Sequence, residues 1–131
     1  MIRQLAALIL AAGAAMAQVP EPSGFRGEPY RAPVPATLTG AQVIDTDQAL
    51  RLHDQGAVFI DPLPRKQRPE GLPEGTIWRA PVHETIPGAV WLWGTGYEML
   101  SEDERQRLED GLEQASGGDR SVPMVFFCRA E

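Results

Sequence analysis

Two short, uninterrupted apolar runs limit what this chain can fold into. Residues 57–60 precede Asp61, and residues 122–127 precede Cys128, the only cysteine. Neither run alternates polar and apolar residues, as a strand with one solvent-exposed face would. Continuous apolar strands are typical of parallel sheets that helices cover on both faces. The sequence therefore predicts an α/β fold with a central parallel sheet.

Capping residues predict two helices. Residues 45–48 and 101–104 both have the form of a capping box, in which the first and fourth residues bond each other's backbone. The first helix should end near Asp54. The second carries small or apolar residues at 108, 111, 112 and 115, one face of a helix, and Gly117 should end it.

Three further segments have the composition of short strands. Residues 43–44 are expected to form a brief edge strand, and residues 77–78 either a short strand or an anchoring tuck. Residues 89–92 follow the turn residues Pro87 and Gly88 and should form another apolar strand.

The N-terminus has the order of a secretory signal peptide. A basic start with Arg3 precedes an apolar run of 11 residues (5–15) and a small-x-small site at residues 15–17. The run is shorter than the roughly 20 residues that span a bilayer. We expect residues 1–17 to be removed, leaving a periplasmic protein without stable membrane insertion. Residues 18–38 are rich in proline and should form an extended lead-in.

Charge and ligand residues argue against several kinds of partner. The chain of 131 residues has a net charge of -6, which becomes -7 when Arg3 is lost with the signal. An acidic chain without a basic stripe is a poor binder of nucleic acid. Only His53, His83 and Cys128 could supply nitrogen or sulfur ligands, and they form no metal-binding motif, so neither a metal nor a cofactor is expected.

A single cysteine in an exported chain cannot form an internal disulfide. Cys128 is then a buried spectator, a reactive thiol, or half of a pair with a cysteine elsewhere. Chemistry in open α/β sheets lies at the carboxyl ends of the strands, where both Asp61 and Cys128 are expected. For Asp61 a loop cap and a role in the site remain equal alternatives.

The order of these segments resembles a rhodanese-like domain. The matching parts are the helix from Thr46, the strand 56–61 ending in Asp61, the turn 83–89, and the strand ending in Cys128. The resemblance covers residues 39–128. It implies a three-layer rhodanese-like fold with a central parallel sheet, of which residues 39–131 form an incomplete domain whose C-terminal part is missing.

A narrower resemblance adds a biological setting. The signal peptide, the Pro-rich loop, residues 91–96 and residues 127–130 are similar to a periplasmic subfamily associated with PQQ-dependent (quinoprotein) alcohol catabolism and named for a CXXCW motif. The implied chemistry is sulfur transfer or thiol redox at Cys128, between a small sulfur donor and a thiol acceptor. A thiosulfate-type sulfurtransferase is one form of it, and the shortened chain is expected to be inactive.

The resemblance also assigns roles to individual residues. Arg129 would stabilise a thiolate or an anionic substrate, and Asp61 would orient a loop. The arginine that the family usually carries two residues after this aspartate is replaced by Leu63, and Arg65 is the nearest candidate. His83 is expected to stabilise its turn rather than act as a general base, since no partner is identifiable from the sequence.

Two other functions remain open from the sequence. One is a non-catalytic accessory module for a periplasmic quinoprotein dehydrogenase or cytochrome, with Trp78, Trp91 and Trp93 as candidate contacts. The other is a phosphatase on the same fold. The length of the loop after the cysteine would distinguish a phosphatase from a sulfurtransferase.

We expect the chain to be a shortened copy of a longer protein, because the resemblance ends at the cysteine. Sequencing the gene beyond codon 131 should reveal the helix–strand–helix that completes such a domain. A stop codon directly after Glu131 would contradict this expectation.

Overall fold

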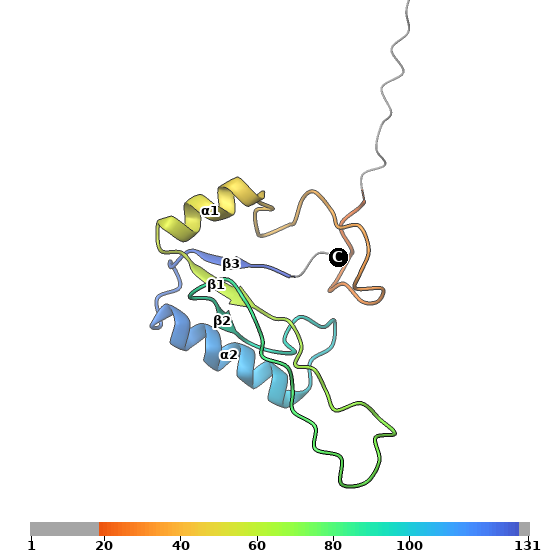
Figure 1. The fold of residues 1–131 in the computed structure, drawn as a ribbon. Coiled ribbons are helices and arrows are strands. Elements are labelled where there is room, and N and C mark those ends of the chain that lie inside the picture. The colour runs from red at the N-terminus through yellow and green to blue at the C-terminus, as the bar shows by residue number, and fades with distance from the viewer. Residues whose placement is uncertain (1–18, 129–131) are drawn as a thin grey trace, which may run out of the picture.

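The computed structural model describes residues 19–128, which form a mixed α/β structure (Figure 1). Its elements, in chain order, are α1 (Thr46–Asp54), β1 (Val58–Asp61), β2 (Val90–Trp91), α2 (Glu102–Ser116) and β3 (Met124–Phe126). The strands form one parallel sheet in the order β2-β1-β3. One helix lies on each side of this sheet (Figure 1). The predicted α/β class and central parallel sheet are confirmed, whereas the expected signal peptide (1–17) lies outside the described residues.

Both predicted capping boxes are present. Asp45 Oδ1 accepts a hydrogen bond from the Gln48 N–H at 2.8 Å, and Gln48 Oε1 accepts one from the Asp45 N–H at 2.9 Å. Ser101 and Glu104 make the same reciprocal pair at the start of α2. α2 ends at Gly117, whose φ of 63° lies in the left-handed region that glycine adopts without steric cost.

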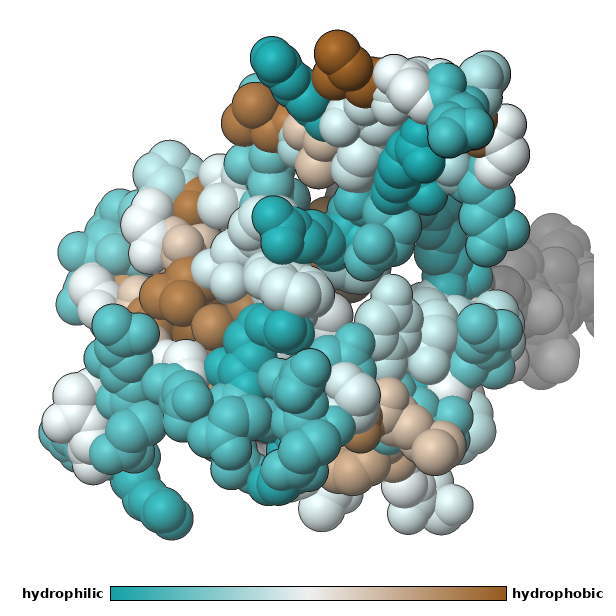
Figure 2. All heavy atoms as spheres, turned by 90° about the horizontal axis from the view of Figure 1, so that it is seen from below, coloured by the Kyte–Doolittle hydropathy of each residue, from teal (hydrophilic) through white to brown (hydrophobic). Residues whose placement is uncertain are grey.

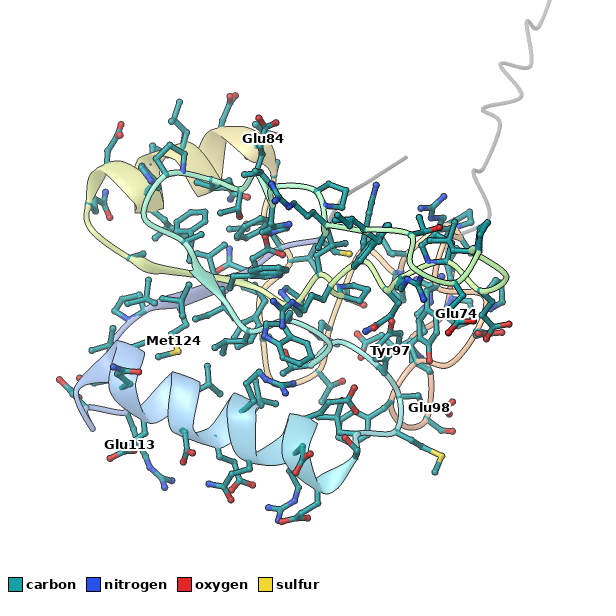
Figure 3. The ribbon with its side chains drawn as sticks, turned by 60° about the horizontal axis from the view of Figure 1, so that its bottom comes forward. Glu74, Glu84, Tyr97, Glu98, Glu113 and Met124 are labelled. Atoms are coloured by element: carbon teal, nitrogen blue, oxygen red, sulfur yellow. The ribbon has the colours of Figure 1, made fainter. Side chains whose placement is uncertain are left out.

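The centre of the fold is β1, which has a neighbour on each side and helices above and below. Phe59 is in register with Val125. Its ring packs against that of His53 from α1, with the ring centroids 5.2 Å apart and the ring planes nearly perpendicular. Ile60, which is fully buried, points to the opposite face, which α2 covers. Met124 of β3 lies between the sheet and α2 (Figure 3). The strand is therefore buried on both faces, as its continuous apolar sequence predicts.

His53, in the last turn of α1, makes two contacts outside the helix. Besides packing against Phe59, its Nε2 donates a hydrogen bond to the Pro87 carbonyl at 2.9 Å. A carbonyl can only accept, so Nε2 carries the hydrogen. The side chain thus ties α1 to the turn that leads into β2.

The second helix approaches the sheet closely at Gly111. A Cβ built on Gly111 would lie 2.3 Å from Leu92 Cδ2, and Leu92 itself is buried. The stripe predicted at 108, 111, 112 and 115 is half-buried, and no residue of α2 is fully buried. The face of the molecule seen from below, where α2 lies, is largely hydrophilic (Figure 2).

Several predicted strand boundaries were wrong. Residues 43–44 do not form the expected edge strand, and Val43 is 47% exposed. Residues 77–78 form no strand either; of the alternative, an anchoring tuck, the structure shows a half-buried Trp78 beside Ile77, which is 85% exposed. Pro123 has no N–H to add to a ladder, so β3 starts at Met124, although the Pro123 carbonyl still accepts from Val58. β2 is confined to Val90–Trp91.

The Pro-rich segment before α1 lies against the turn that follows β2. Tyr30 meets Tyr97 edge to face, with ring centroids 5.4 Å apart, and the Glu98 side chain lies against Gly27. Tyr97 and Glu98 can be followed beside this segment in Figure 3. Among residues 19–128, no helix is long and apolar enough to cross a membrane.

We predict that Gly111→Ala destabilises the protein by about 1 kcal/mol. The added methyl group overpacks against Leu92, which should lower the free energy of unfolding by about 1–3 kcal/mol. The better helix propensity of alanine should raise it by at most about 1 kcal/mol. Urea denaturation measures the change in the free energy of unfolding.

A double-mutant cycle provides the control. In a Leu92→Ala background the methyl has room, so Gly111→Ala should be neutral or stabilising there. Equal effects of Gly111→Ala in both backgrounds would show that the close approach to Leu92 is not the cause.

Candidate functional site

The most connected polar group of the sheet is the carboxylate of Asp61. Asp61 is the last residue of the central strand, only 3% exposed, and in register with Trp91 on β2. Its Oδ2 accepts hydrogen bonds from the Thr85 hydroxyl at 2.6 Å and from His83 Nε2 at 2.7 Å. Its Oδ1 accepts one from the Leu63 N–H at 3.0 Å. We call Asp61, Leu63, His83, Thr85 and Trp91 the Asp61 cluster.

These contacts determine the ionisation of Asp61. Burial alone would raise the pKa of the carboxyl group. The hydrogen bonds from Thr85, from the Leu63 N–H and from His83, together with attraction to His83, outweigh burial and hold the pKa of Asp61 below its usual value. Asp61 is therefore an anion near neutral pH, although it is buried.

The imidazole of His83 is oriented from two sides. Its Nε2 faces the carboxylate, and its ring stacks on Trp91 with centroids 4.0 Å apart and planes 13° apart. Because the Asp61 carboxylate only accepts, Nε2 carries a hydrogen and Nδ1 is the nitrogen left for other partners. The Trp91 Nε1–H in turn donates to the Leu63 carbonyl at 2.7 Å.

The Asp61 cluster closes the base of a long loop. Leu63 lies at the start of the segment between β1 and β2, and His83 and Thr85 lie near its end. The intervening residues 64–82 contain no helix or strand and project from the sheet (Figure 1). One carboxylate thereby holds together chain segments separated by 22 and 24 residues.

A pocket of about 820 Å³ lies beside the Asp61 cluster. Trp91, His83 and Phe127 form part of its wall, and Arg65 and Lys66 add two exposed cationic side chains. All of residues 80–87 line the pocket as well. The volume is in the range of small-molecule sites, which are mostly apolar with a few polar groups that orient the ligand.

Cys128 lies at the same edge of the sheet as Asp61. β3 is paired with β1 through Phe126 and Ile60, and the Phe127 N–H donates to the Ile60 carbonyl at 3.2 Å. The next residue is Cys128, whose side chain is exposed. Within residues 19–128, no hydrogen bond or ion pair joins the thiol to Asp61, His83 or Arg65. Arg129, the other predicted site residue, lies outside the described residues.

Arg65, predicted from the sequence as the nearest candidate for the arginine that the resemblance implies, points toward Trp93. Its guanidinium carbon lies 5.3 Å from the centre of the Trp93 ring, while Arg107 of α2 lies 3.4 Å from the same ring centre and donates to the Trp93 carbonyl. Trp93 is thus in contact with two arginines. Because Arg65 also lines the pocket, this contact helps to position a cation at the rim.

The sequence reasoning did not identify the pairing of His83 with Asp61. A usable signal was present, since His83 and Thr85 are two residues apart, and alternate side chains of an extended segment point to the same side. What the spacing alone does not reveal is that the buried acceptor for both is Asp61. Among the described residues, no group of three His, Cys, Asp or Glu side chains is arranged to hold a metal ion.

Comparisons with known proteins find no matching family model, no matching curated protein and no matching solved structure.

We predict that Asp61→Asn lowers the free energy of unfolding at pH 7 by about 2–4 kcal/mol, since it replaces a buried anionic acceptor of three hydrogen bonds. Asp54→Asn, at an exposed position, should change it by no more than about 0.5 kcal/mol.

The loss of stability caused by Asp61→Asn should depend on pH in a defined direction. The pKa of Asp61 is lower in the folded protein than in the unfolded chain. Its contribution to the free energy of unfolding is therefore fully present above the unfolded carboxyl pKa of about 4, and it is lost as the pH falls through the pKa of the folded protein. The gap between wild type and Asp61→Asn should therefore narrow in acid. A gap that stays constant from neutral to strongly acidic pH would contradict this role of Asp61.

Proposed function

We propose that this chain is a periplasmic rhodanese-like protein that carries sulfur on Cys128. The observation that carries the proposal is the place of Cys128. It is an exposed thiol two residues beyond the end of β3, at the carboxyl edge of a parallel sheet whose central strand ends in Asp61. This is the edge where open α/β sheets place their ligands.

The chemistry follows from the nucleophilicity of a thiolate. The Cys128 thiolate attacks the outer sulfur of thiosulfate or a related donor. A new S–S bond forms, the bond inside the donor breaks, and sulfite leaves with the bonding electron pair. An acceptor thiolate then attacks the outer sulfur of the Cys128 persulfide and regenerates the cysteine thiolate.

Asp61 and Arg129 have different roles in this proposal. Asp61 is a positioning residue. It accepts hydrogen bonds from Leu63, His83 and Thr85 and so holds the loop beside the sheet edge. Arg129, which follows the cysteine directly in the sequence, would stabilise the thiolate or the anionic donor.

The setting we propose is PQQ-dependent alcohol catabolism, which rests on the resemblance of the sequence to the CXXCW-motif subfamily. A non-catalytic accessory module for a quinoprotein dehydrogenase remains the alternative. The geometry favours it less, because Trp91 and Trp93 are engaged with His83 and Arg107. Binding to such a dehydrogenase that survives Cys128→Ser would support the alternative.

We predict that the complete gene product, reduced and then treated with thiosulfate, gains one sulfur atom at Cys128. Intact-protein mass spectrometry followed by peptide mapping would locate it, and cyanide should remove it as thiocyanate. Cys128→Ser is the matched control and should gain no sulfur. Absence of any added sulfur with thiosulfate, a thiosulfonate and a polysulfide would contradict the proposed sulfur transfer.

A further inference from the structure

The wall of the pocket beside the Asp61 cluster offers few free polar groups. Both oxygens of Asp61 accept hydrogen bonds, the Thr85 hydroxyl donates to Asp61, and the Trp91 indole N–H donates to Leu63. The larger part of the surface left for a ligand is therefore apolar. It includes the rings of Trp91, which ends β2, and Phe127, which follows β3, so the two rings come from the strands on either side of β1.

The rim of the pocket has the opposite character. Arg65 and Lys66 are exposed, and neither forms an ion pair with a carboxylate of residues 19–128. The acidic residue of the rim is Glu84, whose side chain points away from the sheet (Figure 3). Asp61 also lines the pocket, but it is buried and both of its oxygens already accept hydrogen bonds.

We propose that this pocket binds a small organic anion with a flat apolar body, of the aryl carboxylate or aryl sulfonate class. The ring would lie against Trp91 and Phe127, and the acidic group would face Arg65 and Lys66. A volume of about 820 Å³ accommodates such a molecule and is larger than a lone inorganic oxyanion needs. The binding does not depend on reaction at Cys128, so it holds or fails separately from the proposed sulfur transfer.

Binding is tested on the full chain with two isosteric probes, 2-naphthoate and the uncharged 2-naphthamide. Isothermal titration calorimetry gives the affinities, and the indole N–H resonance of Trp91 in an NMR spectrum reports the place. We expect 2-naphthoate to bind roughly tenfold more tightly than 2-naphthamide, because only the anion engages the rim cations. Both probes should shift the Trp91 resonance.

A pair of exposed positions provides matched variants. Val82 lines the pocket and is 90% exposed, whereas Ile77 belongs to the same loop, is 85% exposed and is not part of the pocket wall. Val82→Asp should weaken 2-naphthoate binding about three- to tenfold and leave 2-naphthamide binding unchanged. Val82→Lys should strengthen 2-naphthoate binding, and Ile77→Asp should alter neither. Since both side chains are exposed, thermal melting should confirm that all three variants fold.

Three outcomes would overturn the proposal. They are equal affinities for the two probes, no displacement of the Trp91 resonance at saturating 2-naphthoate, and equal weakening by Val82→Asp and Ile77→Asp. Cys128→Ser separates this proposal from the proposed function, because it should abolish sulfur loading and retain 2-naphthoate binding. Loss of both properties in Cys128→Ser would show that the pocket does not act independently of the thiol.

Discussion

The carboxylate of Asp61 is the group on which the arrangement at the carboxyl edge of the sheet depends. A buried anion is tolerated only when it is well supplied with hydrogen-bond donors, and here Leu63, Thr85 and His83 donate to both of its oxygens. Each donor belongs to the segment that leaves β1 or returns to β2. The same three bonds that make the charge tolerable therefore give the long connection a defined path.

The pocket is a consequence of that path. With the two ends of the connection held at Asp61, residues 80–87 line the pocket together with Trp91 and Phe127 at the sheet edge. His83 belongs both to the pocket wall and to the hydrogen bonds around Asp61. One face of its ring stacks on Trp91, and its Nε2 donates a hydrogen bond to the Asp61 carboxylate. Aromatic packing and charge compensation are thus provided by a single side chain, and Cys128 lies at the same edge.

The parts of the fold that follow from local rules were predictable. Both helices begin at capping boxes whose reciprocal hydrogen bonds involve residues three positions apart, and the central strand is recognisable because both of its faces are buried. The segments 43–44 and 77–78 have apolar residues but no neighbouring strand to pair with, which composition does not reveal. The pairing of His83 with Asp61 was missed for a related reason, because it spans 22 residues and depends on the register of β1 and β2. The position of Cys128 at the strand end was expected, whereas its lack of a hydrogen-bonding partner within residues 19–128 comes from the structure.

The closed base of the connection between β1 and β2 also has a consequence for how the chain can vary. Between Glu70 and Gly75 the loop is exposed apart from a half-buried Leu72, and its only backbone hydrogen bond nearby is the local one from Thr76 to Pro73. Lengthening a loop whose ends are already held together adds little entropic cost. The tip is therefore the natural place for insertions, tags or a foreign peptide, because extra residues there would leave the Asp61 cluster and the sheet unchanged.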